Sequence, residues 1–218
     1  MKKLGSQTVK FQNPPSIIGT ATIVGPKEGQ GRFKDYYDII LKDSLYQEKS
    51  WEKAETKILK EAVEIAIKNS QVPNAKIDYF IAGDLLNQII SASFAARELG
   101  LPFLGIFGAC STIAEGALLG SMLIDGGFGE NLVAASSSHF CTAERQFRYP
   151  LELGNQRKPT SQWTVTGAGA MVLSAKAQNP RITFATVGKV IDMGEADPND
   201  MGTAMAPAAV DTIVTHFQ

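Results

Sequence analysis

The chain has 218 residues, of which 44% are hydrophobic and 20% are charged, and its formal net charge is −1. A chain of this length and composition is expected to be globular, with a substantial core and one or two domains. The balanced charge gives no electrostatic basis for a nucleic-acid partner or for a basic membrane-binding surface. The two cysteines, Cys110 and Cys141, are too few for a disulfide framework, and we expect them to be reduced.

The N-terminal residues include Lys2 and Lys3 but no apolar core of signal-peptide length. No uninterrupted apolar run approaches the ~18 residues needed to cross a bilayer. We therefore expect the chain itself to be soluble, while a peripheral place on a membrane complex stays open.

The first regular elements follow an irregular opening. Residues 51–69 show helical periodicity, with charged residues between the apolar ones. The apolar positions of this helix are Ala54, Ile58, Ala62, Ile65 and Ala66. Residues 77–82 are predicted to form a strand, and a short helix over 91–99 leads into a second strand over 103–107.

A long apolar helix is predicted next, over residues 113–124, and it ends at Asp125–Gly127. Residues 131–137 return as a buried strand. The order strand, helix, strand, helix, strand predicts right-handed crossovers and a mainly parallel sheet covered on both faces. The fold class is therefore α/β.

The remaining sequence is less regular. Residues 141–162 are more polar and favour a solvated loop, with a partner surface or the closure of a pocket over an anion as alternatives. Strands are predicted over 164–174 and 181–191, and a helix over 207–217. A helix with no strand after it suggests an incomplete second α/β unit.

Three polar residues, Asp84, Cys110 and His139, fall just after predicted strands. Loops at the carboxyl ends of parallel strands are the usual ligand site of such sheets, so the three side chains could converge there. The alternative, at least as good for any one of them, is that the residue caps a helix or completes a turn.

Gly108–Thr112 joins an apolar strand to the apolar helix. A cysteine in such a turn faces the positive end of the helix dipole, which favours a thiolate or a bound anion. The alternative is a buried cysteine beside a Ser/Thr helix cap. The segment alone does not decide between them.

Several longer motifs resemble the stage V sporulation protein AD family. They are Gly25–Glu28, Gly83–Gln88, Phe107–Thr112, Ile124–Phe128, Thr142–Pro150 and Met201–Pro207. The resemblance implies a thiolase-like layered fold of two similar α/β halves, which commonly dimerises. Residues 1–177 would form the first half and residues 178–218 would begin the second, which is incomplete because the relatives are longer.

The resemblance also implies a function. It predicts a protein that is not an enzyme, binds dipicolinic acid (pyridine-2,6-dicarboxylic acid), and helps membrane-embedded sporulation channel proteins load it into the developing spore. The chain would lie on the cytoplasmic side, peripheral at the inner membrane of the forespore or spore, and would be a homodimer when full length.

The competing function is a thiolase-like acyltransferase in which Cys110 attacks a thioester and backbone N–H groups stabilise the oxyanion. We favour binding, because the longer motifs match the sporulation family specifically. In addition, the polar residues that assist the cysteine in condensing enzymes come largely from the second half. We therefore assign no catalytic residue.

A flat aromatic dianion needs apolar walls and donors for two carboxylates, and a cation could bridge them. We expect N–H groups near Cys110 to act as donors, Lys27 to supply charge, and Asp84 to orient a donor, accept a proton or hold calcium. His139 could carry or donate a proton. Asn199 is a further candidate, although both it and Lys27 lie in segments typical of solvated turns.

No cofactor is expected, and the ligand is either free dipicolinate or its calcium chelate. The few Cys and His residues have no zinc-site spacing, so we assign no metal-ligating residue.

Overall fold

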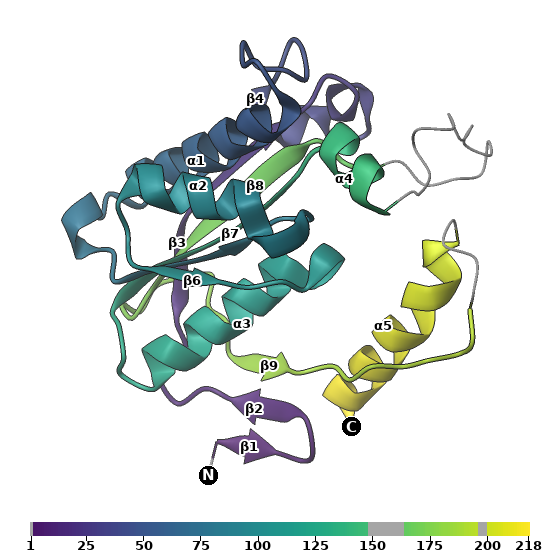
Figure 1. Ribbon diagram of the computed structural model, residues 1–218. Helices are drawn as coiled ribbons and strands as arrows, with labels where there is room; N and C mark the ends of the chain where they lie inside the picture. The colour runs from purple at the N-terminus through teal and green to yellow at the C-terminus, as the bar shows by residue number, and fades with distance from the viewer. Residues whose placement is uncertain (1, 148–163, 196–199) are drawn as a thin grey trace.

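The computed structural model describes residues 2–147, 164–195 and 200–218 (Figure 1). Its main feature is a six-stranded sheet with the strand order β4-β3-β8-β7-β5-β6. In that order the strands are Ile39–Ile40, Ser16–Val24, Gly167–Ser174, Asn131–Ser138, Tyr79–Gly83 and Phe103–Gly105. Every strand of this sheet except β8 runs in one direction, because β3 pairs in parallel with β4, and β5 with both β6 and β7. The predicted mainly parallel α/β sheet is confirmed.

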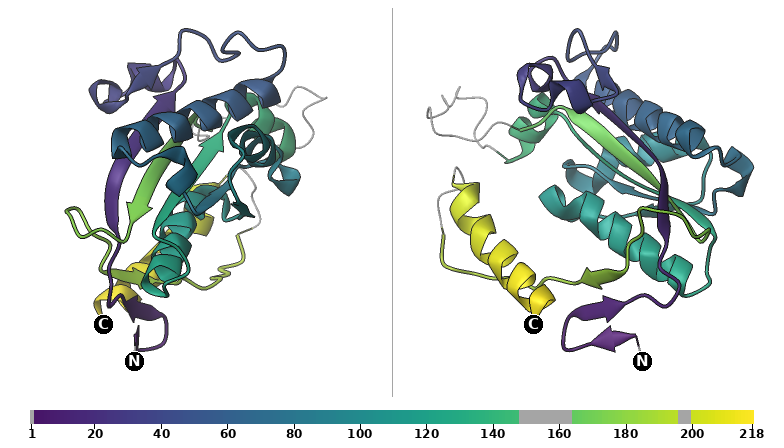
Figure 2. Two further views of the ribbon diagram at one scale, coloured as in Figure 1. Left: turned by 90° about the vertical axis from the view of Figure 1, so that its left-hand side faces the viewer. Right: turned by 180° about the vertical axis from the view of Figure 1, so that it is seen from behind.

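Helices cover both faces of the sheet (Figures 1 and 2). α1 (Trp51–Ser70) and α2 (Ile90–Leu99) pack on one face, and α3 (Thr112–Asp125) packs on the other. Side chains of β5 alternate accordingly, since Phe80 and Ala82 join the α1 side of the core and Ile81 joins the α3 side.

Local sequence explains where these helices begin and how closely they approach. Ser50 caps α1 by accepting a hydrogen bond from the Lys53 backbone N–H at 3.3 Å. α3 lies close to the sheet at Gly120, where an added Cβ would come within 2.8 Å of Leu173 Cδ1. α4 (Phe140–Phe147) follows β7 directly.

A second, three-stranded sheet joins the N-terminal strands to the last part of the chain. β2 (Thr8–Lys10) pairs antiparallel with both β1 (Lys3–Leu4) and β9 (Phe184–Thr186). α5 (Met201–Phe217) packs mainly on β9 and stands apart from the six-stranded sheet in Figures 1 and 2. The division into residues 1–177 and 178–218 remains a prediction, and the β2–β9 pairing crosses it.

Several sequence expectations need correction. The opening is not irregular, since β3 lies inside the sheet between β4 and β8. The strand expected over 164–174 begins at Gly167, and the one expected over 181–191 is limited to β9. α5 begins at Met201 rather than 207, because Asp200 caps it by accepting hydrogen bonds from both the backbone N–H and the hydroxyl of Thr203.

Within the described ranges, no helix is long and apolar enough to cross a membrane.

Candidate ligand site at the carboxyl edge of the sheet

Four of the predicted site residues lie at one edge of the large sheet. Lys27, Asp84, Cys110 and His139 follow β3, β5, β6 and β7, and these strands end at the same side. β5, β6 and β7 are neighbours, whereas β8 separates β3 from β7. Lys27 is therefore the most distant of the four in the strand order. The fifth residue, Asn199, lies outside the described residues.

Asp84 is buried, and its carboxylate is occupied by the backbone. Oδ1 accepts from the Leu86 N–H at 2.7 Å, and Oδ2 accepts from the Ala92 N–H at 2.6 Å. Burial raises the pKa of Asp84, and the hydrogen bonds from backbone N–H groups oppose that rise. Asp84 thus fixes the turn between β5 and α2, as the helix-capping alternative described.

That turn is held in an unusual conformation. Gln88 and Ile89, just before α2, both have positive φ values of 60° and 47°. The left-handed region is unfavourable for a β-branched residue such as Ile89, so the surrounding structure must impose it. The two hydrogen bonds to Asp84 bracket this segment and provide that constraint.

Cys110 is exposed, in the short 3₁₀ helix η5 (Ala109–Ser111) between β6 and α3. The alternative of a buried cysteine is therefore wrong. Ser111 makes no side-chain cap for α3, because its Oγ donates to the Gly108 carbonyl at 2.7 Å. Ala109 has a φ of 47°, which is also strained for a non-glycine residue.

A carboxylate that sequence reasoning missed lies beneath this turn. Glu115 is in the first turn of α3. Its Oε2 lies close to Gly108, because a Cβ added to this glycine would be 2.6 Å from that oxygen. This oxygen is buried and has no hydrogen-bond partner in the described part of the chain. An acid in the first turn of a helix is common, so its position alone gave no signal of a site.

His139 is fully buried at the end of β7. Its Nδ1 accepts from the Cys141 backbone N–H at 3.2 Å, and its Nε2 lies 2.9 Å from the Ser44 carbonyl oxygen. A carbonyl only accepts, so the ring is neutral with its hydrogen on Nε2. The imidazole stacks on Phe140, with ring centroids 5.1 Å apart, and Trp51 lies tilted against it at 5.2 Å. Its contacts are those of a structural histidine.

Lys27 is exposed in the loop after β3. The neighbouring residue ties this loop to the turn after β7, because Glu28 Oε1 accepts from the Thr166 N–H at 3.2 Å and Thr166 Oγ1 accepts from the Phe140 N–H at 3.0 Å. The Lys27 loop is thereby connected to the rest of the carboxyl edge.

A family model described as "Stage V sporulation protein AD" matches residues 5–218. The chain belongs to this family. Stage V sporulation protein AD of Bacillus subtilis (strain 168) is 48% identical over 218 residues, which are 100% of this chain and 64% of that protein. The chain thus spans less than two thirds of that relative's length.

Solved structures outside the sporulation family share the fold. OleA H285N of Xanthomonas campestris gives a TM-score of 0.52 at 16% identity, covering 76% of this chain and 57% of that one. 3-Oxoacyl-[acyl-carrier-protein] synthase III of Aquifex aeolicus gives 0.51 at 15% identity, covering 76% and 55%. At such low identity these matches show the fold alone, and the expected thiolase-like fold is confirmed.

This chain also contains a buried acid, Glu55, that sequence reasoning missed. Glu55 of α1 is fully buried, and its Oε1 and Oε2 lie 3.1 Å from Ser137 Oγ and 2.9 Å from Thr142 Oγ1. Burial first, and then the charge of Asp84, raise its pKa from 4.5 to about 7, although the Thr142, Ser137 and Ser91 hydroxyls oppose the shift. The available signal was an acid three residues before Ile58 on the apolar stripe of a helix.

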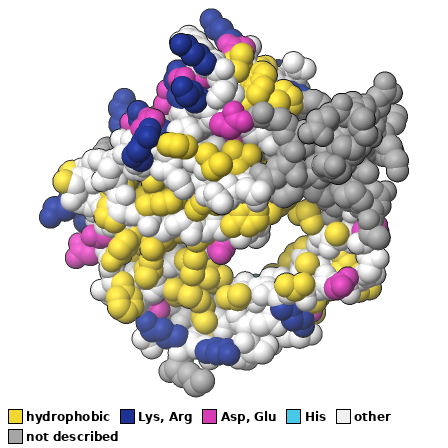
Figure 3. Space-filling view, in the orientation of Figure 1, with side chains coloured by type: hydrophobic (Ala, Val, Ile, Leu, Met, Phe, Trp, Pro, Cys, Tyr) yellow, Lys and Arg dark blue, Asp and Glu magenta, His cyan; other side chains and the backbone are white. Residues whose placement is uncertain are grey.

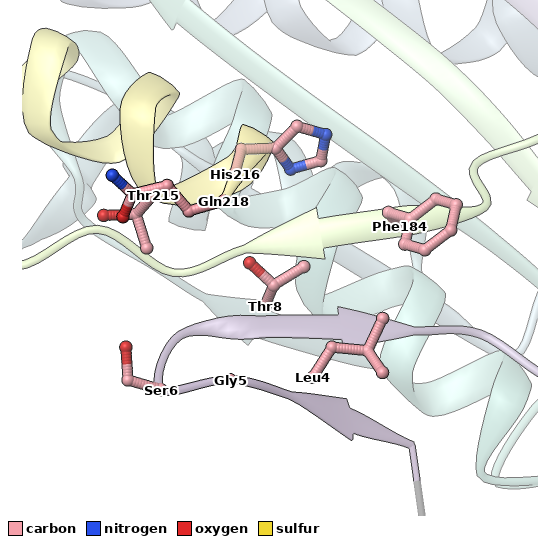
Figure 4. A pocket seen from close by; sticks show the side chains of 8 residues that line it. All are labelled: Leu4, Gly5, Ser6, Thr8, Phe184, Thr215, His216 and Gln218. Atoms are coloured by element: carbon pink, nitrogen blue, oxygen red, sulfur yellow. The ribbon is translucent and has the colours of Figure 1, made fainter.

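A cavity of about 460 Å³ lies elsewhere, between the small sheet and the end of α5 (Figure 4). Leu4, Thr8, Phe184 and His216 are among its lining residues. It contains none of the predicted site residues. Among the described residues, no group of three or more His, Cys, Asp or Glu side chains is placed to hold a metal ion.

Proposed function

We propose that this protein binds dipicolinic acid at the carboxyl edge of its sheet, beside Cys110, and assists uptake of the acid into the developing spore. The observation that carries the proposal is family membership along residues 5–218, together with exposure of the Cys110 turn at that edge. In this proposal the protein is peripheral at the inner membrane of the forespore or spore and works with membrane-embedded channel proteins.

The chemistry of the Cys110 turn supports an anionic ligand. The start of α3 has no side-chain cap from Ser111, so the positive end of the helix dipole is available to a carboxylate. Lys27 would add positive charge from the loop after β3. Glu115 has the opposite effect, because its carboxylate, of which Oε2 is buried, would repel a bare dianion. The combination favours dipicolinate bound as its calcium chelate.

Asp84 would act on this site indirectly. Its two oxygens hold the backbone of the β5–α2 turn, and β5 touches the Cys110 turn through Gly83, where an added Cβ would lie 3.0 Å from Thr112 Cγ2. Loss of Asp84 would therefore disturb the wall of the site rather than remove a ligand contact.

The second candidate is acyl transfer by Cys110. Its support is the shared fold with OleA and 3-oxoacyl-[acyl-carrier-protein] synthase III and the exposed thiol after the strained Ala109. Both ring nitrogens of His139 are already engaged within the protein. His139 is therefore a poor general base for Cys110, and we prefer ligand binding.

Calorimetric titration with dipicolinate, with and without calcium, tests the binding proposal. Cys110→Ala is expected to weaken binding at least about tenfold, equivalent to ~1.4 kcal/mol, while the half-buried Cys141→Ala serves as the matched cysteine control. Benzene-1,3-dicarboxylate, which lacks the ring nitrogen, should bind more weakly. Equal affinities of wild type and Cys110→Ala would overturn the site assignment.

Intact-mass measurement after incubation with acetyl-coenzyme A distinguishes acyl transfer from ligand binding. We expect no acetyl adduct on wild-type protein, and Cys110→Ala gives the blank. A rapid stoichiometric adduct that is lost in Cys110→Ala would favour the enzyme instead.

We also propose that the full-length protein is a homodimer. Hydrophobic side chains gather over α2, β6 and α3 on the face shown in Figure 3, and Ile90, Phe94, Leu104 and Phe107 are all exposed. Exposed apolar patches of this kind are typical of association surfaces. Light scattering of the full-length protein should give the dimer mass, and a monomer at micromolar concentration would contradict it.

A further inference from the structure

The Thr142 hydroxyl beside Glu55 lies within hydrogen-bond distance of two acceptors. Thr142 Oγ1 lies 2.9 Å from Glu55 Oε2 and 3.0 Å from the His139 carbonyl oxygen. A threonine hydroxyl has one hydrogen to donate, and the carbonyl can only accept. If Glu55 were ionised, one hydrogen would therefore serve two acceptors. A hydrogen on Oε2 removes the conflict, because Glu55 then donates to Thr142 and Thr142 donates to His139.

The neighbouring acid cannot take this role. Both oxygens of Asp84 accept short hydrogen bonds from backbone N–H groups, at 2.7 and 2.6 Å, which is the pattern of an ionised carboxylate. Two buried carboxyls that influence each other do not both ionise readily. The geometry thus places the negative charge on Asp84 and the hydrogen on Glu55.

We infer that Glu55 is a buried proton-binding site whose bound proton fixes the β7–α4 turn against α1. The hydrogen-bonded chain runs from Glu55 through Thr142 to the His139 carbonyl, which also accepts the Ala143 N–H at 3.0 Å at the start of α4. Ser137 Oγ adds a second link, from β7 to Oε1. Release of the proton breaks the donation to Thr142 and sets a second negative charge beside Asp84.

Among the described residues, the elements packed against Glu55 carry few other ionisable groups. The strands that pack under α1, which are β3, β7 and β8, carry no ionisable side chain. In α2 the ionisable residues are Arg97 and Glu98 in its last turn, and Glu98 pairs with Lys60 at 3.3 Å. On the adjoining turns the described ionisable groups include Glu28, Asp43, Asp84, His139 and Cys141. Glu144 and Arg145 of α4 have side chains outside the described part.

The sign of the pH effect follows from the raised pKa. Between the ordinary value of 4.5 and about 7, the folded protein keeps the Glu55 proton and the unfolded chain loses it. Stability therefore falls as pH rises through this window and levels off above it.

Infrared spectroscopy of the whole chain in D₂O tests the proton directly. At pH 6 we expect the carbonyl stretch of a protonated carboxylic acid, which disappears in Glu55→Gln and persists in Glu64→Gln. Glu64 is the matched control, being an exposed acid of the same helix with a 4.0 Å contact to Lys60. A protonated band that survives in Glu55→Gln would overturn the inference.

Two further measurements keep the test decisive. If Glu55→Gln does not fold, ¹³C-glutamate labelling of wild type should shift the band, whereas a shift with ¹³C-aspartate would assign the proton to an aspartate and overturn the inference.

Hydrogen exchange tests whether the Glu55 proton fixes the β7–α4 turn. After correction for intrinsic rates, protection of the Ala143 amide should fall about tenfold between pH 5 and pH 8 in wild type and Glu64→Gln, but not in Glu55→Gln. An unchanged wild-type profile would refute that role.

Discussion

The turns after β5 and β6 are neighbours at the same edge of the sheet, yet they treat their polar residue in opposite ways. After β5, Asp84 is buried and both of its carboxylate oxygens bind backbone N–H groups. After β6, Cys110 is exposed and the hydrogen bonds of its turn are made by Ser111 and Thr112 instead. A polar residue at a strand end can therefore either build the site or face the ligand, and topology alone does not distinguish them.

The strongest test of the first turn is its packing against the second. An added Cβ on Gly83 would lie 2.0 Å from the Ile106 carbonyl oxygen, a backbone atom that cannot move aside cheaply. We expect Gly83→Ala to lower the free energy of unfolding by about 3 kcal/mol. Urea denaturation measures this. Gly169→Ala is the control, because nothing lies within 4 Å of its added Cβ, and it should be neutral or slightly stabilising.

The next largest effect concerns Asp84 itself. Asp84→Asn keeps the size of the side chain but turns an NH₂ group toward a backbone N–H, leaving one buried donor without an acceptor. We expect a loss of about 2 kcal/mol in urea denaturation. Asp38→Asn is the control, since exposed Asp38 also accepts a backbone N–H, from Thr22 at 2.7 Å. A cost no larger than that of the control would show that the β5 turn does not depend on Asp84.

These two positions also show how far the sequence could lead. The strand ends predicted that Asp84, Cys110 and His139 share one edge, because parallel strands end on one side. Whether each side chain is buried depends on atoms distant in the chain. Asp84 accepts the Ala92 N–H at the end of a segment in which Gln88 and Ile89 adopt left-handed conformations. The residue types of Gln88 and Ile89 do not predict these conformations.

The fold shows the same division. The helix over 51–69 was predictable from its apolar stripe, and α1 covers Trp51–Ser70. β3 was missed, and part of the reason is Gly19 in the middle of it, which weakens a strand signal. An added Cβ there would lie 2.4 Å from the Ala66 carbonyl oxygen. The glycine serves a close approach between β3 and α1 that exists only in the folded protein. Glu55 was missed for a related reason, because its hydroxyl partners come from β7 and α4.

A smaller effect, of opposite sign, is expected in the Cys110 turn. Ala109 has a left-handed φ of 47°, so Ala109→Gly should relieve strain and raise the free energy of unfolding by about 1 kcal/mol. The control is Ala114→Gly, at an exposed helical position of α3, which should lower it by about 0.5–1 kcal/mol. Destabilisation by both variants would mean that the turn is not strained.

The smallest effect on stability is expected at Cys110, and there the contrast with Asp84 becomes a chemical one. The thiol is exposed, and among the described residues the side-chain hydrogen bonds of its turn are made by Ser111 and Thr112. Cys110→Ser should therefore change the free energy of unfolding by less than about 0.5 kcal/mol. The same exposure predicts that a maleimide labels Cys110 of the folded wild type before the half-buried Cys141. Peptide mass mapping after short labelling times gives the order, and the single variants Cys110→Ser and Cys141→Ser assign each rate. Two results would contradict this prediction: faster labelling of Cys141, or a loss of stability in Cys110→Ser as large as that in Asp84→Asn. Either would mean that the β6 turn is a structural turn like the β5 turn, and would argue against a ligand site beside Cys110.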